Sequence, residues 1–390
     1  MYGDPIIIVG AGQCGVKSIE TIRRLGFRQE IILIGDENYL PYHRPPLSKG
    51  FLKGDVNQES LFITNQSFFD ERNVKTIFGT RAVYIDSDKH IIGLKNGQQL
   101  SYSKLLLALG SRPRNLEIPG INLKGICSIR TIDDVKSFLG SLKIGNLRIV
   151  IIGGGYTGLE VASSMRICGH QVTLIESKES VLKRVVCQQV SDFFESLHER
   201  HGVSILKKIV PKQFLGEKSV SAIELSNGKV IECDIVVVCI GNIPEVELAV
   251  SAGIEIDNGI KVDPTCQTSA EDIYAAGDCA SFLSQRYGRV IRLESVQNAV
   301  DQGKAAAQAI LGETMHYDPI PWFWSDQYNT RLQIAGISDD YDYFETERGK
   351  RAQSFSVTYF KKGHLICVES VNDARAYLKG RRTLEEASTC

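Results

Sequence analysis

Two glycine-rich turns in the sequence combine the residue types and the spacing that a bound dinucleotide requires. In the middle of the chain, Gly153, Gly155 and Gly158 follow the apolar run RIVII at G-x-G-x-x-G spacing. Glycine suits these positions because the turn must be tight, the backbone must approach a pyrophosphate, and the helix must pack closely on the strand. The next apolar run ends at Glu176, a carboxylate that can accept hydrogen bonds from an adenosine ribose. These residues predict a nucleotide site.

The N-terminus carries a second copy of the same pattern. Gly10, Gly12 and Gly15 follow the run IIIV and lead into a helical stretch. A further apolar run, IILIG, is followed by Asp36 and Glu37 at the position of the ribose-binding acid. Two distant copies indicate an internal repeat of a nucleotide-binding fold, and they predict two different bound dinucleotides.

A proline-rich segment, YHRPPLSK, follows the first copy. Pro45 and Pro46 fix the backbone φ angle and predict a rigid wall beside a ligand, with a helix that begins near Leu47. Arg44 and Lys49 place positive charge on both sides of the prolines. The alternative interpretation is a solvated turn with two surface cations.

The elements that position these residues predict an α/β fold with a discontinuous first domain. The exits LLLALGSRP and CIGNIPE resemble each other, so residues 118–245 are predicted to form a complete inserted domain that carries the second dinucleotide motif. Residues 1–117 and 246–319 then form the first dinucleotide-binding domain. Within it, 75–105 is a small meander in which Arg81 to Val83 could present backbone to an adenine. Alternating, aromatic-rich runs predict a C-terminal α+β domain over 320–390.

The composition excludes several classes of partner. With 45 basic and 46 acidic residues, the net charge is −1, so no global field favours nucleic acid or an anionic membrane. The longest apolar runs are shorter than the ~20 residues that a membrane-spanning helix needs. The chain enters a strand almost at once, so we expect no signal or transit peptide. Ten cysteines without a C-x-x-C pair fit a reducing compartment and predict a cytoplasmic protein.

Other possible ligands in the sequence are weaker. His198 and His201 lie three residues apart near a helix end, but no further ligand is near, so we expect surface histidines and no metal site. Cys233 and Cys239 are six residues apart on one strand, which is too far for a disulfide. Cys14 lies within the first glycine turn and is interpreted as packing.

Nine segments occur in the order and spacing of a known family. They are GAGQCG, YHRPPLSK, ALGSRPR, SIRTIDD, GGGYTGLE, CIGNIPE, AAGDCA, ESVQNA and PWFWSDQY. The chain resembles the FAD-dependent ferredoxin reductases of bacterial oxygenase systems, the putidaredoxin reductase-like family. The resemblance covers essentially the whole chain, and YHRPPLSK and PWFWSDQY are its discriminating parts. It implies two Rossmann-like domains arranged as in glutathione reductase, plus a C-terminal α+β domain.

The resemblance implies two cofactors, FAD and NADH. FAD is expected at Gly10, Gly12, Gly15, Asp36, Glu37, Arg44, Pro45, Lys49, Val83, Ala108, Gly110, Arg130, Gly277, Asp278, Ser295, Val296 and Trp324. NADH is expected at Gly153, Gly155, Tyr156, Gly158, Glu160, Glu176 and Gly241. A carboxylate at Glu176 favours NADH over NADPH because it repels a 2′-phosphate. Three basic residues just beyond it could weaken the preference: Lys178, Lys183 and Arg184.

The implied reaction is hydride transfer from NADH to FAD, with Lys49, Glu160 and Trp324 as the catalytic residues. Lys49 is expected to lie near the flavin, where its ammonium stabilises the reduced state and needs a buried partner. Glu160 is that partner by resemblance. Its alternative role is that of a carboxylate at a helix N-terminus.

The electron acceptor implied by the resemblance is an acidic two-iron ferredoxin that binds transiently and feeds a haem or Rieske oxygenase. Basic docking candidates are Lys304, Lys379, Arg381 and Arg382. No cysteine pair stands where disulfide reductases keep one, which disfavours disulfide chemistry. The alternatives are another acceptor, such as rubredoxin or monodehydroascorbate, and an NADH-sensing flavoprotein like apoptosis-inducing factor. We expect a monomer or weak dimer.

Overall fold

The computed structural model describes residues 4–142, 145–313 and 316–387. The chain divides into two compact units. The first unit comprises Met1–His43, Leu61–Arg112 and Ile243–Pro321, and the second comprises Arg44–Ser60, Pro113–Asn242 and Trp322–Cys390. The short strands β8 (Ser111–Pro113) and β17 (Asn242–Pro244) contain two of the points at which the chain passes from one unit to the other.

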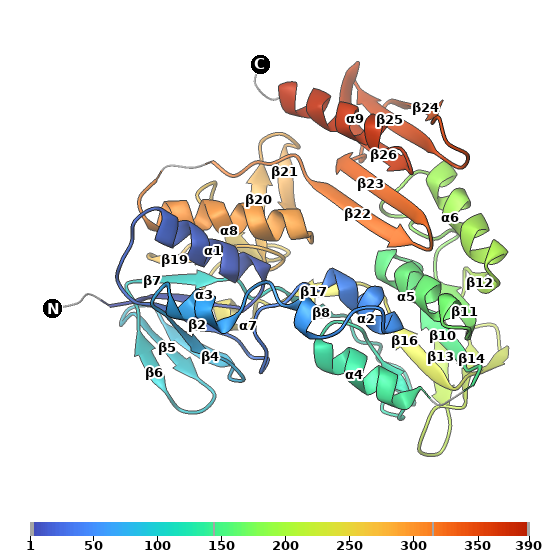
Figure 1. Ribbon diagram of the computed structural model, residues 1–390, viewed down its shortest axis with the longest axis horizontal. Helices are drawn as coiled ribbons and strands as arrows, with labels where there is room; N and C mark the ends of the chain where they lie inside the picture. Colours follow the sequence, from blue (N-terminus) through green and yellow to red (C-terminus); the bar gives the residue numbers. More distant parts are fainter. Residues whose placement is uncertain (1–3, 143–144, 314–315, 388–390) are drawn as a thin grey trace. The chain divides into compact units, whose positions relative to one another are not determined.

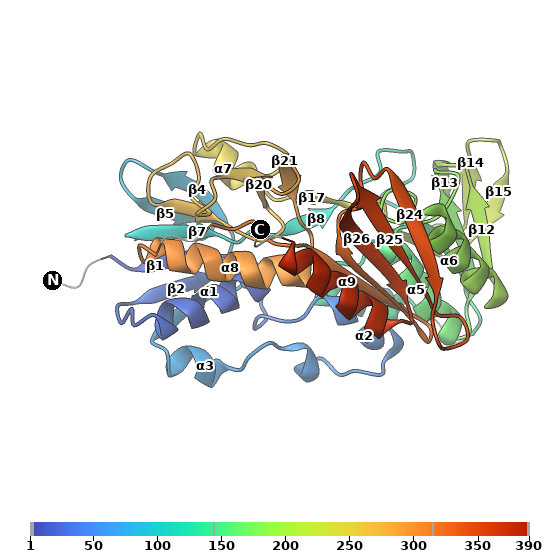
Figure 2. The ribbon, with the colours of Figure 1, turned by 90° about the horizontal axis from the view of Figure 1, so that it is seen from above.

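The first unit is built on a five-stranded parallel sheet in the order β19-β7-β1-β2-β3. Its strands are β1 (Ile6–Val9), β2 (Ile31–Ile34), β3 (Val74–Ile77), β7 (Lys104–Leu107) and β19 (Ile273–Ala275). Every residue of β1 and β2 is buried, as expected for parallel strands that are covered on both faces. Helices α1 (Gln13–Arg24) and α8 (Val296–Ile310) lie side by side against this sheet (Figure 1, Figure 2).

Smaller elements complete the first unit. The predicted meander is confirmed as an antiparallel sheet of β4 (Ala82–Asp86), β5 (Ile91–Leu94) and β6 (Gln99–Ser101). The remaining elements are η2 (Glu59–Leu61) at its boundary, α3 (Gln66–Asp70), α7 (Glu247–Ser251), β18 (Ile260–Val262), β20 (Ala280–Ser284) and β21 (Arg289–Arg292).

The second unit repeats the same plan. Its parallel sheet has the order β12-β11-β10-β16-β9, formed by β9 (Ile126–Cys127), β10 (Arg148–Ile152), β11 (Gln171–Glu176), β12 (Val203–Lys207) and β16 (Ile235–Val238). Its helices are α4 (Ile132–Ser141), α5 (Tyr156–Ile167) and α6 (Gln188–Arg200). An antiparallel sheet of β13 (Pro211–Leu215), β14 (Ala222–Leu225) and β15 (Val230–Glu232) accompanies it. Two similar folds, each built on a five-stranded parallel sheet, are thus present.

The C-terminal residues form an antiparallel sheet within the second unit. The order is β22-β23-β26-β25-β24, with β22 (Trp322–Gln327), β23 (Thr330–Gly336), β24 (Tyr343–Arg348), β25 (Phe355–Lys361) and β26 (His364–Val371). Helix α9 (Ala374–Glu386) packs so closely on β26 that a Cβ on Gly380 would lie 2.7 Å from Val368. The predicted α+β character of this region is confirmed. The predicted limits of the three domains stay a prediction.

The proline-rich segment folds with the second unit, although the sequence assigned it to the first domain. Its prolines begin a short 3-10 helix, η1 (Pro45–Ser48), and the short α2 (Gly50–Lys53) follows. A helical stretch near Leu47 is therefore confirmed. The reason for its placement is a set of hydrogen bonds from Ser48 and Lys49 to α5, described below.

Candidate functional site

The first glycine turn has the geometry of a pyrophosphate cradle. Gly10 has a φ of +120°, and a Cβ there would lie 2.0 Å from the carbonyl oxygen of Ala108. A Cβ on Gly15 would lie 2.3 Å from the Gly10 oxygen, so α1 could not approach the strand with any larger residue. At Gly12, by contrast, a Cβ would meet nothing within 4 Å among the described residues. This open side fits a phosphate that approaches the backbone.

The three glycines of the second turn have the same surroundings as those of the first. Gly153 has a φ of +106°, and a Cβ would lie 2.3 Å from the oxygen of Cys239. A Cβ on Gly158 would lie 1.9 Å from the Gly153 oxygen, and one on Gly155 would meet no described atom within 4 Å. Neither α1 nor α5 has a side-chain N-cap in the described parts of the chain. The N–H groups of both first turns are therefore suited to a phosphate.

Other predicted residues of the first unit gather at the same end of its parallel sheet. Ala108 directly follows β7, and Gly277 follows β19 and lies against Cys14 of α1. The N–H of Gly277 donates to Gln302 Oε1 at 2.8 Å. The carboxyl ends of parallel strands are where such folds bind nucleotides. The packing interpretation of Cys14 is confirmed, and burial raises the pKa of its thiol.

The remaining predicted residues of the first unit are placed as follows. Ser111 Oγ donates to Asp278 Oδ2 at 2.9 Å, which fixes this carboxylate. Ser295 caps α8 by accepting the N–H of Asn298, so Val296 begins that helix. Val83 is 46% exposed on β4. Gly110 has a positive φ of +74° after β7.

The acids differ between the two turns. Glu176 Oε2 accepts the N–H of Gly154 at 2.7 Å, and Oε1 accepts the N–H of Lys178 at 2.7 Å, so this carboxylate lies directly beside the second turn. In the first unit, Asp36 is exposed, and Glu37 accepts the hydroxyl of Tyr42 at 2.5 Å.

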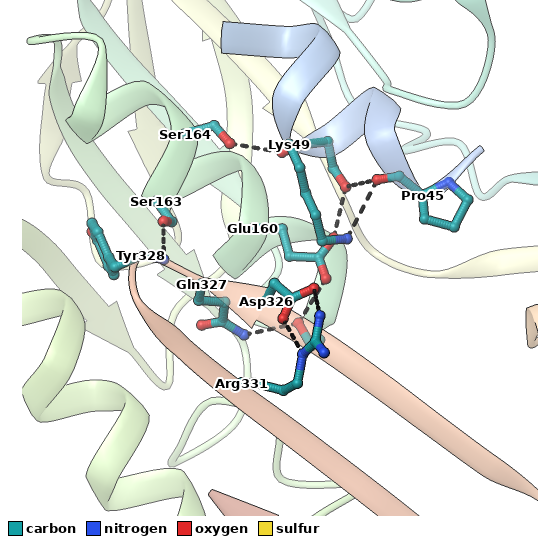
Figure 3. A network of polar contacts seen from close by, with 11 residues as sticks. Pro45, Lys49, Glu160, Ser163, Ser164, Asp326, Gln327, Tyr328 and Arg331 are labelled. Carbon is teal, nitrogen blue, oxygen red and sulfur yellow. Dashed lines mark hydrogen bonds and ion pairs between the residues drawn. The ribbon is translucent and has the colours of Figure 1, made fainter. Parts of the chain in front are cut away.

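The predicted pairing of Lys49 with Glu160 is confirmed (Figure 3). Lys49 Nζ lies 2.7 Å from Glu160 Oε2, and the two side chains are 21% and 7% exposed. Ser48 Oγ also donates to Oε2, at 2.6 Å, and Ser325 Oγ donates to Oε1 at 2.6 Å. A buried ion pair is stable only when further hydrogen bonds offset its desolvation, and the two serines supply them.

The other predicted residues of the second unit have the following positions and contacts. Arg44 Nη1 donates to the carbonyl oxygen of Arg130 at 2.7 Å, and the N–H of Arg130 donates to Asp134 at 3.0 Å. Pro45 accepts a hydrogen bond from Lys49 Nζ through its carbonyl oxygen at 3.3 Å. Gly241 is exposed after β16 with a φ of +100°.

An aromatic cluster lies where α5 begins. The ring of Tyr156 lies 4.4 Å from the ring of Phe323, and burial raises the pKa of its hydroxyl. The ring of Trp324 is 6.5 Å from that of Phe323 and 5.8 Å from that of Trp322. Arg381 of α9 lies over Trp322, with 5.2 Å between the guanidinium carbon and the ring centre.

The prediction that His198 lies on the surface is wrong. Its exposed fraction is 0%, it hydrogen-bonds Gln327 at 2.8 Å, and burial lowers its pKa to about 4. His201 is exposed as predicted and stacks on Tyr328 at 3.7 Å. The sequence interpretation missed Ser325, whose two-residue spacing from Gln327 places both on one face of β22. No group of three possible metal ligands occurs in the described ranges.

The basic docking candidates belong to different elements. Lys304 is half-buried on α8, and Lys379 is exposed on α9. On α9, Arg381 pairs with Glu385 at 2.9 Å and Arg382 pairs with Glu386 at 2.7 Å. Among the described helices, none is both long enough and apolar enough to cross a membrane.

Two family descriptions match the chain. Pyridine nucleotide-disulphide oxidoreductase matches residues 4–303, and reductase C-terminal matches residues 322–390. The chain belongs to the pyridine nucleotide-disulphide oxidoreductase family. The predicted oxidoreductase class and the predicted fold class are therefore confirmed.

Several reductases are among the relatives of this oxidoreductase. Rhodocoxin reductase of Rhodococcus erythropolis is 37% identical over 97% of this chain and 89% of its own length. Putidaredoxin reductase CamA of Pseudomonas putida is 38% identical over 95% of this chain and 89% of its own length. The predicted resemblance to the putidaredoxin reductase-like group is confirmed.

Solved structures agree with these relatives. The reductase in the covalent putidaredoxin reductase–putidaredoxin complex superposes with a TM-score of 0.93 at 35% identity, covering 98% of this chain and 93% of that one. The ferredoxin reductase for the CYP199A2 system from Rhodopseudomonas palustris superposes with a TM-score of 0.94 at 37% identity, and the match covers 98% of this chain and 95% of that one.

Proposed function

We propose that this oxidoreductase is an FAD-containing, NADH-dependent ferredoxin reductase of a bacterial oxygenase system. The chemistry that a bound FAD supplies is acceptance of a hydride from NADH and release of the electrons one at a time. The observation that carries the proposal is the pair of open glycine turns, Gly10–Gly15 and Gly153–Gly158, on two separate parallel sheets. Relatives that reduce ferredoxins and match nearly the whole chain support it.

The first turn is proposed to hold the FAD pyrophosphate. The open side of Gly12 and the N–H groups at the start of α1 suit its charge. The carboxylate of Asp278, oriented by Ser111, is suited to a ribityl hydroxyl, and Asp36 or Glu37 to the ribose. The other FAD contacts stay proposals from the resemblance: Arg44, Pro45, Lys49, Val83, Ala108, Gly110, Arg130, Gly277, Ser295, Val296 and Trp324.

The second turn is proposed to hold NADH, with Tyr156 and Gly241 as further contacts. An ionised carboxylate has about four acceptor positions, and Glu176 uses three of them on Gly154, Ser177 and Lys178. The remaining position on Oε2 can accept a ribose hydroxyl, whereas a 2′-phosphate would be repelled. Lys183 pairs with Glu179 at 2.8 Å, which makes it a poor substitute partner for that phosphate.

Lys49, Glu160 and Trp324 are proposed as the catalytic residues. Of the three N–H bonds of the Lys49 ammonium, one points to Glu160 and one to the Pro45 oxygen among the described residues. The third can donate to a ligand. Glu160 keeps the ammonium in place and balances its charge. Trp324 supplies a flat apolar face beside which aromatic rings can align.

The proposed partner is an acidic two-iron ferredoxin that docks transiently in the cytoplasm, through basic residues such as Lys304. The test is anaerobic mixing of the FAD-loaded protein with NADH, followed by ferredoxins and rubredoxins of different charge. We expect rapid flavin reduction and fast turnover only with an acidic ferredoxin. A reduced flavin that persists in the presence of every iron–sulfur acceptor would instead support the NADH-sensing alternative.

A further inference from the structure

A chain of hydrogen bonds leads from Glu160 into the C-terminal sheet (Figure 3). Ser325 Oγ lies 2.6 Å from Glu160 Oε1, and Gln327 Nε2 lies 3.2 Å from Ser325 Oγ. Gln327 Oε1 lies 2.8 Å from His198 Nε2, and the hydroxyl of Tyr328 lies 3.4 Å from His198 Nδ1. Ser325, Gln327 and His198 are 0% exposed, and Glu160 is 6% exposed. Water is thus excluded along most of the chain.

The carboxylate determines the direction of every bond in this chain. An ionised Glu160 only accepts, so the single hydroxyl proton of Ser325 must point to it. Ser325 Oγ then accepts from the amide nitrogen of Gln327, which leaves the amide oxygen toward His198. The proton of the neutral imidazole therefore lies on Nε2, and Nδ1 accepts from Tyr328.

The bond from Tyr328 requires a neutral histidine, because a protonated ring would donate from Nδ1 as well as from Nε2. Because burial lowers the pKa of His198 to about 4, the ring is uncharged near neutral pH. All donors then point toward Glu160. Hydrogen bonds aligned in this way polarise one another in a medium of low dielectric constant.

Local structure separates the chain from the solvent-facing side of the same strand. Ser325 and Gln327 alternate with Asp326 on β22, because successive side chains of a strand point to opposite faces. Asp326 pairs with Arg331 at 2.7 Å, and those side chains are 33% and 57% exposed. The buried face of β22 is therefore the one that meets α5.

We propose that Ser325 is a positioning residue that fixes the Glu160 carboxylate and, through it, the ammonium of Lys49. The two oxygens of the Glu160 carboxylate accept hydrogen bonds from different donors. Oε1 accepts from Ser325, and Oε2 accepts from Ser48 and Lys49. The Ser325 bond holds Oε1 away from the ammonium and so sets the orientation of Oε2. Gln327 and His198 keep the serine hydroxyl pointed at Glu160. The inference rests on the proposed function, because it concerns the alignment for hydride transfer.

The test replaces Ser325 by alanine in the FAD-loaded protein. A hydrogen bond to a charged group corresponds to a factor of about 10 to 100 in a rate that depends on it. We expect the limiting rate of flavin reduction by NADH in stopped flow to fall by about that factor. The NADH concentration for half-maximal rate should change less than about twofold, because Ser325 contacts no proposed nucleotide phosphate site. The conservative Ser325→Thr keeps a hydroxyl and should recover most of the rate.

Ser163→Ala is the matched control. Ser163 is a buried serine of α5 that accepts the N–H of Tyr328 at 2.7 Å, so its removal also costs a hydrogen bond between α5 and the β22–β23 hairpin. It donates nothing to Glu160 in the described structure. Flavin reduction should stay within about twofold of the wild type. Equal losses in Ser163→Ala and Ser325→Ala would show that general loosening of the hairpin, and not the donor to Glu160, controls the rate.

A readout independent of activity is the ¹⁵N NMR spectrum of the histidine rings. The proposal requires the Nε2–H tautomer for His198, and a His198→Gln sample assigns the signal. An Nδ1–H tautomer would reverse the chain and overturn the inference.

The two failures can be told apart. If NADH does not reduce the wild-type flavin, the proposed function is wrong, whatever the tautomer is. If NADH reduces the wild type and Ser325→Ala equally fast, the proposed function stands and the positioning role is wrong.

Discussion

The three glycines of the first turn and those of the second turn have matching surroundings. The two turns differ in the residue that faces them from the neighbouring strand, which is β2 in the first unit and β11 in the second. The strand registers are equivalent, so Gly35 and Glu176 hold corresponding positions. A Cβ on Gly35 would lie 2.7 Å from the Cβ of Ala11. In the second unit Gly154 replaces that alanine, and its N–H donates to Glu176. A small residue in the turn makes room for the acid.

The difference fits our proposal that the two copies of the motif bind two different nucleotides. With Ala11 in the turn, an acid directly after β2 has no space, and the acidic residues come later, as Asp36 and Glu37. In the second unit the carboxylate is part of the turn itself. We therefore expect the same substitution in the two turns to affect two different cofactors.

Alanine at the first glycine of each turn should give the largest effect. Gly10→Ala and Gly153→Ala each place a Cβ within about 2.3 Å of a backbone oxygen at a positive φ, a strain of roughly 3 kcal/mol or more. Gly10→Ala should yield protein without flavin absorbance. Gly153→Ala should retain FAD and lose reduction by NADH. Loss of flavin from both variants would mean that the turns do not serve separate nucleotides.

The two helices that follow the turns carry different residues at the position two places after the third glycine. The second carries buried Glu160, whereas the first carries Lys17, which pairs with Glu20 at 3.0 Å on the surface. Glu160→Gln removes the charge opposite Lys49, and we expect flavin reduction to slow by about 100-fold. Lys17→Ala should change that rate less than about twofold, because exposed pairs contribute little. Stopped-flow reduction checks both, and equal rates in the two variants would contradict the catalytic assignment.

Much of the fold follows from local sequence patterns. The runs before both G-x-G-x-x-G motifs are short, apolar and bounded by turns, which is sufficient to predict buried parallel strands. Thr131 precedes two acids in the first turn of α4, a pattern typical of an N-cap, and the structure shows the complete capping box.

The site was only partly predictable because its polar partners come from distant segments. Lys49 and Glu160 could be paired by resemblance. The burial of His198 could not be predicted, since it depends on a strand, β22, that lies more than a hundred residues later. The placement of residues 44–60 in the second unit likewise depends on long-range hydrogen bonds that no local pattern encodes.

The units differ further in the burial of histidine, which predicts an effect of pH. His198 is fully buried in the second unit, whereas His90 of the first unit is partly exposed. The folded state holds His198 neutral with a pKa of about 4, while the unfolded chain binds a proton below about 6.5. Lowering the pH from 7 to 5 should therefore reduce the contribution of His198 to the free energy of unfolding by on the order of 2 kcal/mol. Glu369, whose pKa burial raises to about 7, contributes in the opposite direction over the same range.

Urea unfolding at the two pH values measures this dependence in variants of both histidines. His198→Gln should shift the difference between the two pH values by about 2 kcal/mol relative to the wild type, because glutamine does not titrate. His90→Gln retains His198 and is the control. A difference in His198→Gln equal to that of the wild type would overturn the assignment to His198.

Exchanging the small residues of the two turns gives the smallest expected effect and tests the comparison most directly. In Gly154→Ala the new Cβ would lie 3.0 Å from Glu176 Oε2 and 3.0 Å from Val181, so the carboxylate must shift. We expect the KM for NADH to rise about tenfold, which corresponds to roughly 1.4 kcal/mol, with FAD retained.

Ala11→Gly removes a methyl group and should cost no more than about 1 kcal/mol of stability. Because the first turn has no acid at the equivalent position, its affinity for FAD should not change. An equal loss of NADH affinity in Ala11→Gly would mean that the space beside Glu176 does not distinguish the two turns.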